Sequence, residues 1–435
     1  MTQALRIGIA GLGTVGAGVV KILAARGSHL AAASGRAVEL VAVSARDKTK
    51  DRGIDLSGVR WEDDPLALAR AGDIDLVIEL IGGSEGVARQ LVEEALKSGK
   101  HVATANKALL AHHGTALARL AEQSGVALNY EAAVAGGIPI VKTMREALAG
   151  NEIRSIHGIL NGTCNYILTE METTGRDFGD VLKDAQALGY AEADPTFDVG
   201  GIDAAHKLAI LASLAFGTEV DFDNVHIEGI DKISATDIAF AAEFGFRVKL
   251  LAIAEKGEGG IVQRVHPALV PAGTPLAAVS GVYNAVAVNG DRVGHLVLEG
   301  RGAGEGPTAS AVISDVVDIA RGTIVPPFIV PAAQLKPPAK PLMDAHKSSF
   351  YLRLRAVDRA GSMAAITKAL ADASISIERI VQRGGKGDES GRMPVVFITH
   401  ETDESTMARA RALLAHHEDV AGTPLVIRIE DGELR

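Results

Sequence analysis

The stretch Leu5–Gly16, which reads LRIGIAGLGTVG, places an apolar run directly before a G-x-G-x-x-G motif. The apolar run predicts a buried strand, and the glycines predict a tight turn into a helix. In such a turn the first glycine permits the bend, the second lets the backbone approach a pyrophosphate, and the third lets helix and strand pack closely. A glycine-rich turn without a ligand is the alternative. We expect five residues to form the phosphate-binding turn: Gly11, Gly13, Thr14, Val15 and Gly16.

Residues 1–135 continue with alternating strand-like and helix-like segments. Short runs rich in Val and Ile recur, separated by amphipathic stretches such as Gly86–Ser98 and Ala108–Ser124. This alternation predicts right-handed βαβ units and a Rossmann-like, doubly wound parallel sheet, an α/β fold. The expected strands are Leu5–Ala10, Ala37–Ser44, Ile74–Ile81, His101–Ala105 and Val126–Glu131.

The pattern changes over residues 136–300. Helix-like segments at Thr163–Thr174, Phe178–Leu188 and Ala204–Phe216 come first, and closely spaced strand-like runs follow them. This order predicts a mixed α+β domain around an antiparallel sheet. We expect the helix Pro307–Arg321 to pack back on the first domain, which residues 301–322 would complete. The expected strands are Lys249–Glu255, Gly260–Leu269, Asn284–Val288 and His295–Glu299.

The C-terminal part begins after a proline-rich stretch. Six prolines lie between Pro326 and Pro341. Because proline fixes φ and lacks an N–H group, they predict an extended linker over residues 323–348. Residues 349–435 then read βαββαβ, with a polar loop at Gly384–Gly391, which is typical of a ferredoxin-like domain.

Composition excludes several classes of protein. A chain of 435 residues predicts two to four domains, and Lys and Arg number 44 against 54 Asp and Glu, a net charge of −10. Without a basic patch, a nucleic-acid partner is not expected. The single cysteine excludes a disulfide framework and fits a reducing compartment. The most apolar stretch, about ten residues, is too short to span a membrane. We therefore expect a soluble, cytoplasmic protein.

Two polar positions near strand ends bear on the cofactor. Asp47 lies just past the second expected strand, where a carboxylate favours NAD, but Arg46 and Lys48 flank it. An Arg at this place accommodates the 2′-phosphate of NADP, so the pattern favours NADP and leaves NAD open. Asn106 and Lys107 follow the strand His101–Ala105, at the sheet edge where ligands bind. A helix cap and an exposed lysine are the alternative for these two.

A cluster of carboxylates precedes an apolar helix between Gly189 and Leu208. Asp203 and Lys207 stand four residues apart at the start of that helix, so they share a face. A lysine beside carboxylates on buried surface can have a shifted pKa and transfer protons. An exposed ion pair at a helix N-terminus is the alternative. The density of acids near a dinucleotide fold favours a catalytic site.

The turn Asn161–Tyr166 offers backbone N–H groups for a carboxylate, and Thr163 is a candidate helix cap. Cys164 is a candidate nucleophile, but no histidine lies near it in sequence, so a small buried hydrophobic role is favoured.

These segments together resemble homoserine dehydrogenase along essentially the whole chain. The tail Tyr351–Gln382, with Asp358-Arg359-Ala360-Gly361, resembles the ACT ligand-sensing domain; Ala360 stands where such domains often carry proline. The resemblance implies NAD(P)-dependent interconversion of L-homoserine and L-aspartate 4-semialdehyde in threonine and methionine biosynthesis. The matching segments are Gly11–Gly16, Ala103–Leu110, Tyr130–Pro139, Asn161–Tyr166, Gly189–Lys207 and Gly302–Ser310.

The resemblance also implies roles for individual residues. Lys207 would be the proton donor and acceptor, with Asp203 beside it and Lys107 between substrate and nicotinamide. Glu192 would hold the substrate amino group in a pocket that also includes Gly162, Thr163, Gly189, Tyr190 and Asp198. Arg46, Asn106, Lys107, Gly304 and Glu305 would join the phosphate-binding turn around the cofactor. Carbonyl oxygens of Glu131, Val134, Gly136 and Ile138 would hold sodium or potassium.

The family further implies dimerisation through the middle domain, as a homodimer or homotetramer, and feedback by threonine at the ACT domain. Truncation near residue 345 is expected to keep catalysis and to abolish any threonine inhibition. Two other functions stay open: an acylating semialdehyde dehydrogenase that uses Cys164 as nucleophile, and a non-catalytic nucleotide and amino-acid sensor.

Overall fold

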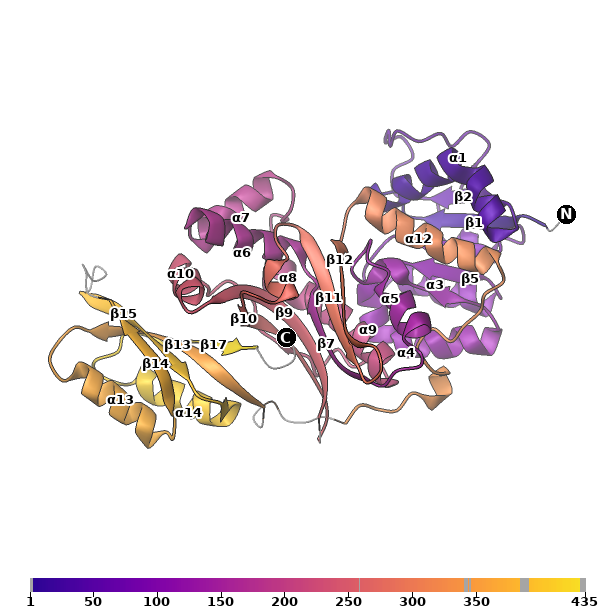
Figure 1. Ribbon diagram of the computed structural model, residues 1–435. Coiled ribbons are helices and arrows are strands. Elements are labelled where there is room, and N and C mark those ends of the chain that lie inside the picture. Colours follow the sequence, from indigo (N-terminus) through magenta and orange to yellow (C-terminus); the bar gives the residue numbers. More distant parts are fainter. Residues whose placement is uncertain (1–2, 258, 340–342, 344–345, 384–390, 431–435) are drawn as a thin grey trace.

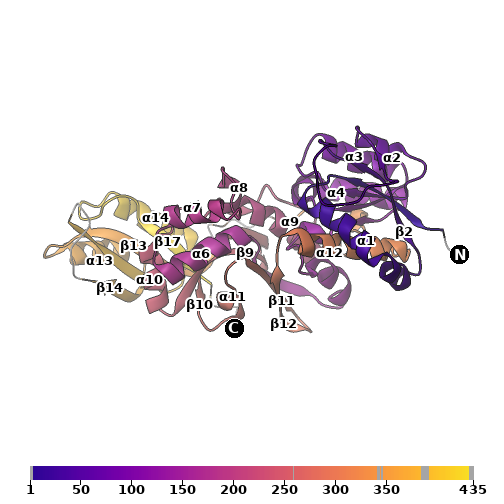
Figure 2. The same cartoon turned by 90° about the horizontal axis from the view of Figure 1, so that it is seen from above.

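The computed structural model describes residues 3–257, 259–339, 343, 346–383 and 391–430. Three parts lie in a row, with the N-terminal sheet at one end and the C-terminal part at the other (Figures 1 and 2). Within the described chain, no helix is long and apolar enough to cross a membrane.

The N-terminal part is the expected parallel sheet, with the order β3-β2-β1-β4-β5-β6. Helices cover both faces: Ile7 and Ile78 pack toward α1 and α12, whereas Val77 and Val102 pack toward α3 and α4. The elements are β1 (Leu5–Ala10), α1 (Thr14–Ser34), β2 (Val38–Ser44), β3 (Arg60–Trp61), α2 (Leu66–Arg70), β4 (Leu76–Glu79), α3 (Val87–Lys97), β5 (His101–Thr104), α4 (Lys107–Ser124) and β6 (Leu128–Asn129). The helix α12 (Glu305–Ala320) contacts α1, as the sequence predicts.

A second sheet forms the middle of the molecule and continues into the C-terminal part. Its order is β12-β11-β7-β9-β10-β17-β13-β15-β14, and the pairs along this path are antiparallel except β10–β17. In the middle part the strands are β7 (Ile153–Ile159), β8 (His226–Ile227), β9 (Phe246–Gly257), β10 (Gly260–Pro271), β11 (Tyr283–Gly290) and β12 (Gly294–Arg301). The helices there are α5 (Ile140–Lys142), α6 (Gly162–Thr174), α7 (Phe178–Ala187), α8 (Thr196–Val199), α9 (Ile202–Phe216), α10 (Ala235–Glu243) and α11 (Pro275–Ala278).

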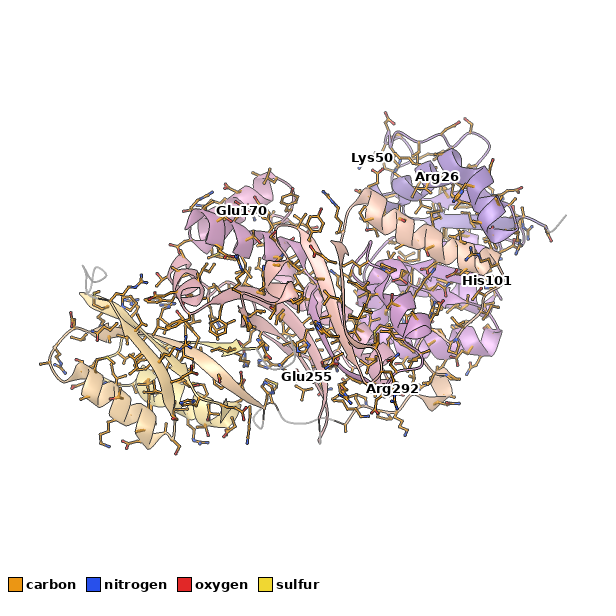
Figure 3. The ribbon with its side chains drawn as sticks, viewed as in Figure 1. Arg26, Lys50, His101, Glu170, Glu255 and Arg292 are labelled. Carbon is orange, nitrogen blue, oxygen red and sulfur yellow. The ribbon has the colours of Figure 1, made fainter. Side chains whose placement is uncertain are left out.

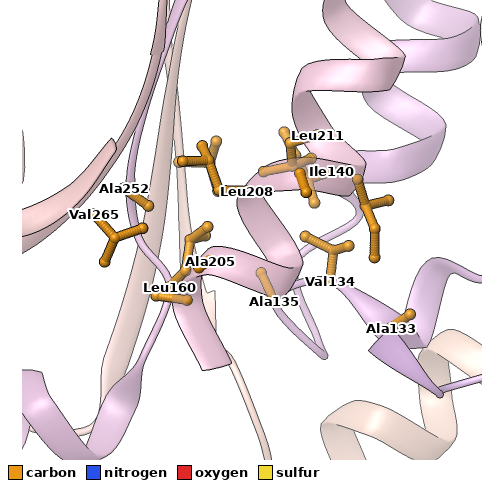
Figure 4. Packing of buried hydrophobic residues seen from close by; sticks show 14 of the residues in the cluster. Ala133, Val134, Ala135, Ile140, Leu160, Ala205, Leu208, Leu211, Ala252 and Val265 are labelled. Atoms are coloured by element: carbon orange, nitrogen blue, oxygen red, sulfur yellow. The ribbon is translucent and has the colours of Figure 1, made fainter. Parts of the chain in front are cut away.

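Helix α9 is buried along most of its length because its residues after Lys207 are nearly all apolar. Figure 4 shows Ala205 and Leu208 beside Ala252 and Val265 of the second sheet. On the other side of α9, Leu211 lies near Ile140 (Figure 4). The start of this helix, which carries Asp203 and Lys207, is therefore fixed between the sheet and the segment that follows β6.

The C-terminal part has the expected ferredoxin-like order. Its elements are β13 (Lys347–Val357), α13 (Ser362–Asp372), β14 (Ile377–Gln382), β15 (Arg392–Thr399), β16 (Thr402–Asp403), α14 (Glu404–Ala415) and β17 (Leu425–Ile429). The loop expected at Gly384–Gly391 lies outside the described residues except Gly391, and part of the expected linker also lies outside them.

The C-terminal part is joined to the middle part by backbone pairing and buried charge. Strand β17 pairs with β10 in parallel, through Ala268 with Arg428 and Leu269 with Ile429. Asp237 at the start of α10 is fully buried and accepts hydrogen bonds from Tyr351 Oη at 2.9 Å and Arg353 Nε at 2.6 Å. The C-terminal part therefore contacts the middle part through both backbone pairing and a buried ionic group.

Some element boundaries differ from those expected. The strand expected at Val126–Glu131 is limited to Leu128–Asn129, and Glu131 opens a 3-10 turn, Glu131–Ala133. The reason is local: the Glu131 carboxylate accepts hydrogen bonds from the backbone of Val141 and Lys142 at 2.9 and 2.8 Å. Glu131 thus turns the chain toward α5 and a π-helical turn, Thr143–Ala147. A further 3-10 turn, Ala332–Gln334, lies within the expected linker.

Candidate active site

A buried ion pair lies at the start of α9. Asp203 and Lys207 are one helical turn apart, and Lys207 Nζ lies 2.7 Å from Asp203 Oδ2. Lys207 Nζ also donates to the carbonyl oxygen of Leu160, at 2.7 Å, where β7 leads into α6. Both side chains are at least nine-tenths buried. The pair is therefore no exposed surface salt bridge.

Lys107 joins this pair from the first domain. Its Nζ lies 2.8 Å from Asp203 Oδ1, so the carboxylate is held between two ammonium groups. Lys107 keeps 34% of its side chain exposed, whereas Lys207 keeps 10%. The first domain and the middle domain thus meet at Asp203, and Lys107 is the more accessible ammonium.

Asn161 connects the cluster to a second carboxylate. Its Nδ2 donates to Asp203 Oδ2 at 2.9 Å and to Asp198 Oδ1 at 2.8 Å. Its Oδ1 accepts from the Cys164 N–H at 2.8 Å and so caps α6. The prediction that Thr163 caps α6 is wrong, because its hydroxyl donates to the Tyr190 carbonyl oxygen at 2.7 Å. Asn before a Gly-Thr turn is a cap signal that the sequence did offer.

Burial and charge shift the pKa values of the cluster in opposite directions. Burial lowers the pKa of Lys207, and attraction to Asp203 offsets only part of this effect. For Asp203 the two ammonium groups outweigh burial and hold its pKa well below the ordinary range. For Lys107 the attraction of Asp203 outweighs burial and raises the pKa. Lys207 is therefore the group of the cluster that gives up a proton more readily than an ordinary lysine.

The other residues predicted to bind substrate lie around this cluster to different degrees. Burial, then repulsion by Asp203, raises the pKa of Asp198. Tyr190 and Glu192 are exposed in the loop between α7 and α8, which begins at Gly189. Within the described chain, the Glu192 carboxylate makes no ion pair. The backbone carbonyl oxygen of Glu192 accepts from Gln186 Nε2 at 3.0 Å. The structure therefore brings Thr163 and Tyr190 together and leaves Glu192 at the surface.

An aromatic group borders the cluster on the side of Lys107. Lys107 Nζ lies 5.8 Å from the centroid of the Phe197 ring. His206 packs between Phe197 and Phe222, at ring-centroid distances of 5.5 and 4.4 Å. Burial, followed by the nearby His112, lowers the pKa of His206 to about 4. Phe197 and Phe222 therefore form an apolar wall beside the charged cluster. The His206 imidazole between them is neutral at neutral pH.

The glycine-rich turn has the geometry that a phosphate-binding turn requires. A Cβ at Gly11 would overlap the Leu80 backbone, and a Cβ at Gly16 would overlap the Gly11 carbonyl, so only glycine fits. A Cβ at Gly13 would meet nothing within 4 Å, which leaves open space above the turn. No side chain caps the N-terminus of α1, which opens with Thr14 and Val15. Unpaired N–H groups at such a helix end favour a phosphate.

A cavity of about 740 Å³ adjoins this turn. Its wall includes Gly13, Arg46, Lys48 and Trp61, with Lys48 Nζ 5.9 Å from the Trp61 ring centroid. Asp47 also lines this cavity, and its Oδ1 accepts from the Thr49 N–H at 2.8 Å. The positive charge and the flat ring suit a nucleotide with an extra phosphate, and Lys50 lines the same cavity (Figure 3).

The remaining predicted cofactor residues lie at helix ends around the same edge. Asn106 caps α4 by accepting from Leu109 N at 3.0 Å, and it donates to the Gly83 carbonyl at 2.8 Å. Gly304 has φ of 117° just before α12, a conformation that favours glycine. Glu305 pairs with Lys21 of α1 at 2.8 Å. The cap role is thus shown for Asn106, and Glu305 ties α12 to the phosphate-binding helix.

The four residues expected to bind a cation lie on one tight turn after β6. Ala135 and Gly136 have φ of 54° and 46°, and a Cβ at Gly136 would overlap the Gly302 carbonyl. The Glu131 carboxylate is used by the backbone of α5, which leaves carbonyl oxygens as the donors. Such oxygens suit a hard cation, so the donor set fits sodium or potassium.

Comparisons with known proteins can now be set beside this geometry. Residues 11–131 match the NAD-binding domain of homoserine dehydrogenase, residues 139–317 match homoserine dehydrogenase, and residues 350–412 match the ACT domain. The homoserine dehydrogenase of Pseudomonas aeruginosa is 44% identical over 432 residues, which cover 98% of this chain and 99% of that protein. This chain belongs to the homoserine dehydrogenase family. It is accordingly an oxidoreductase that acts on a CH–OH group, with an NAD(P)-binding domain and a C-terminal ACT domain.

Solved structures of homoserine dehydrogenases agree with this assignment. The crystal structure of the enzyme from Thiobacillus denitrificans has a TM-score of 0.92 and 44% identity, and the match covers 99% of both chains. A hyperthermophilic archaeal homoserine dehydrogenase in complex with NADPH has a TM-score of 0.64 and 26% identity, covering 74% of this chain and all of that one.

Proposed function

We propose that this protein interconverts L-homoserine and L-aspartate 4-semialdehyde, with NADP as its preferred cofactor, in threonine and methionine biosynthesis. The observation that carries the proposal is the cluster of Lys107, Asp203 and Lys207 at the junction of the cofactor-binding and middle domains. A bound nicotinamide would supply hydride transfer, and the protein would have to position the substrate and move one proton.

Lys207 is proposed as the group that moves this proton at the substrate oxygen. Its lowered pKa makes the neutral amine more accessible than in an ordinary lysine, and a general acid–base group works best with a pKa near the working pH. Asp203 holds the ammonium form in place and orients it. Lys107, more exposed and with a raised pKa, is proposed to remain charged beside the developing negative charge of the substrate oxygen.

The amino-acid end of the substrate needs an anion and a set of donors. Glu192 and Asp198 are proposed to receive its ammonium, although Glu192 lies at the surface of the present loop and would have to move inward. Gly162 and Thr163 at the start of α6 are proposed to receive its carboxylate, because the first N–H groups of a helix lack partners within the helix. Gly189 and Tyr190 would complete the pocket, since Thr163 already binds the Tyr190 carbonyl.

The NADP preference rests on Arg46 and Lys48 in the wall of the cavity beside Gly13. We expect Arg46→Ala to lower kcat/KM for NADP by about tenfold relative to NAD, because a charge-assisted hydrogen bond to a phosphate contributes about 1.5–3 kcal/mol. The matched control is Arg26→Ala, an exposed arginine of α1 outside this cavity (Figure 3). Equal losses for both cofactors would contradict the preference.

The carbonyl oxygens of Glu131, Val134, Gly136 and Ile138 are proposed to hold sodium or potassium. Their turn packs on the segment before α12, because the Gly137 N–H donates to the Arg301 carbonyl at 3.0 Å. Cation binding would thus stiffen the loop that leads to Gly304. The measurement is thermal unfolding in sodium, potassium and tetramethylammonium chloride at equal ionic strength, where the two small cations should raise the Tm.

Threonine feedback is proposed to act through the C-terminal part. Threonine should inhibit the full chain, and a protein that lacks residues 346–435 should lose the response. Because that deletion also removes the partner of β10, thermal unfolding of the shortened protein has to be measured beside its activity. Inhibition that persists in a folded, shortened protein would place the threonine site in the other two domains.

The decisive experiment for the whole proposal is steady-state kinetics with L-homoserine and each cofactor, with and without threonine. Reduction of NADP that depends on homoserine is the expected result. An absence of turnover would favour the non-catalytic sensor instead, and turnover that requires phosphate or a thiol acceptor would favour the acylating dehydrogenase.

A further inference from the structure

Asn284 is a buried amide beside the proposed site, and its oxygen has no partner in the part of the chain that the structure describes. It is the second residue of β11 and is 1% exposed. Its Oδ1 has no hydrogen-bond partner among the described residues. A buried amide atom without a partner is costly, which makes such atoms in a folded protein candidates for binding something else.

Asn284 lies where the proposed catalytic elements converge. It pairs with Gly300 of β12, and the next residue, Ala285, pairs with Ile159 of β7. One residue beyond Ile159, Leu160 accepts the hydrogen bond from Lys207. The amide is thus anchored at the end of the sheet at which the proposed proton-transfer lysine is held.

One glycine makes room for this amide, and a second lies beside it. A Cβ at Gly302, in the segment that leads to α12, would overlap the Asn284 side chain. A Cβ at Gly162, the first residue of α6, would lie 3.4 Å from Asn284 Oδ1. The side chain therefore lies between the N-terminus of α6 and the segment that leads to Gly304.

The backbone before Asn284 is clamped to α6. Asn165 Nδ2 donates to the carbonyl oxygens of Val279, Gly281 and Tyr283 at 3.3, 3.0 and 3.2 Å. The Gly281 N–H in turn donates to Thr169 Oγ1 at 3.1 Å. These contacts fix the position of Asn284 relative to the start of α6, which is the condition for a residue that positions a ligand.

We propose that Asn284 is a substrate-binding residue, whose amide nitrogen donates to the α-carboxylate of the amino-acid substrate beside the N–H groups of Gly162 and Thr163. Among the described residues, the Asn161 side-chain oxygen accepts from the Cys164 N–H and its carbonyl from the Asn165 N–H, so the N–H groups of Gly162 and Thr163 remain available. A half-turn of the amide exchanges oxygen and nitrogen without changing its shape, so the donor can face the helix end. This inference rests on the proposed function, because it assumes an amino-acid substrate at α6.

The test uses the full chain with Asn284→Ala and Asn284→Asp. Wild-type turnover of homoserine is measured first, since its absence refutes the proposed function and not the role of Asn284. Asn284→Ala should raise KM for homoserine and the inhibition constant of L-2-aminobutyrate, which keeps the amino-acid end but lacks the hydroxyl, by about tenfold each. The kcat and the KM for NADP should stay within about threefold. Asn289→Ala, on the same strand, is the matched control and should change none of these.

The Asn284→Asp variant distinguishes a role of Asn284 in binding the substrate from a role in filling space. It keeps the size of the side chain but adds a negative charge, so KM for homoserine should rise further than in Asn284→Ala through repulsion of the substrate carboxylate. A fall in KM would mean that Asn284 binds the ammonium instead and would overturn the proposal. An unchanged KM for homoserine with a raised KM for NADP would assign the amide to the cofactor and would also overturn it.

The double variant Gly302→Ala/Asn284→Ala tests the steric alternative. Gly302→Ala alone should lower Tm and activity, because the new methyl group overlaps the amide. If Asn284 only fills space, the double variant recovers both Tm and KM, which would overturn the proposal. We expect the double variant to recover Tm and to keep the raised KM of Asn284→Ala.

Discussion

Two charge clusters of this protein contain similar groups but differ in the ratio of cations to carboxylates. In the catalytic cluster, Asp203 faces the ammonium groups of Lys107 and Lys207, and Lys107 remains one-third exposed. In the junction between the middle and C-terminal parts, Arg264 is 1% exposed and its guanidinium binds Glu255 at 2.8 Å and Glu430 at 3.2 Å. Figure 3 labels Glu255, which is on β9, an interior strand of the second sheet.

The two clusters differ in the sign of their excess charge and in the kind of cation they contain. At the junction, one guanidinium is shared by two carboxylates, with His157 and His266 at 3.3 and 3.4 Å from them. In the catalytic cluster two ammonium groups share Asp203, and one of them has a lowered pKa. An ammonium that loses its proton more readily in a partly open place favours proton transfer, so we call Lys107, Asp203 and Lys207 the open cluster. A guanidinium stays charged and suits holding two parts together, so we call Arg264, Glu255 and Glu430 the closed cluster.

The largest expected effect is on catalysis at the open cluster. Lys207→Ala should lower kcat by about 10²–10⁴-fold, the usual contribution of a general acid–base group. NADP affinity, measured by fluorescence titration, should change little, because Lys207 contacts Asp203 and Leu160 at the start of α9 and not the glycine-rich turn. The matched control is Lys97→Ala, a surface lysine that is 60% exposed. Near-wild-type turnover would remove Lys207 from the mechanism.

The next effect is on stability at the closed cluster. Arg264→Leu removes the buried cation shared by Glu255 and Glu430, whose side chains are 26% and 11% exposed. Breaking a mostly buried pair costs up to about 3–5 kcal/mol of unfolding free energy. Denaturant unfolding should show this loss, while kcat of the folded fraction should stay within about threefold, since Arg264 touches none of the catalytic cluster. The control is Lys256→Ala, which breaks an exposed pair with Glu152 and should cost less than about 1 kcal/mol.

Acid should weaken the closed cluster over a defined pH range. Despite burial, hydrogen bonding to His157 and attraction by Arg264 lower the pKa of Glu255 to about 2. Because this pKa lies below its value in the unfolded chain, near 4.5, the unfolded state binds the proton more readily. The stability is therefore present above about pH 4.5 and is lost as the pH falls toward 2. Thermal unfolding of wild type and Glu255→Gln should be measured at several pH values. The difference between their Tm values should become smaller as the pH falls through this range, and a constant difference would contradict the prediction.

The smallest effect is expected for Cys164, which lies beside the open cluster without belonging to it. Its thiol is buried, burial raises its pKa well above the usual range, and Sγ donates to the Asp198 carbonyl at 3.2 Å. A thiol held protonated in this way is a poor nucleophile. Cys164→Ser, which can keep the same hydrogen bond, should leave kcat with homoserine within about threefold. Loss of activity would revive the acylating mechanism.

The two clusters differ in whether their contacts could be predicted from the sequence. Asp203 and Lys207 are visible in the sequence because a four-residue spacing on a helix guarantees a shared face. Arg264 is on β10, Glu255 is on β9, and Glu430 directly follows β17, 166 residues beyond Arg264. Only the pairing of β10 with β9 and β17 brings them together. The link that Asn161 makes between Asp198 and Asp203 was missed for a related reason, since it joins different elements. The proposed role of Asn284 likewise depends on neighbours from other elements.

By itself, the sequence determined the alternation of strands and helices, the glycine-rich turn at residues 11–16, the parallel first sheet and the ferredoxin-like tail. These follow from local periodicity and from backbone positions that only glycine can occupy. The tertiary structure alone decided that Lys107 reaches Asp203 and that the tail continues the middle sheet through β17. Those outcomes depend on strand register and on packing between distant segments, which the chain settles only when it buries its apolar surface as a whole.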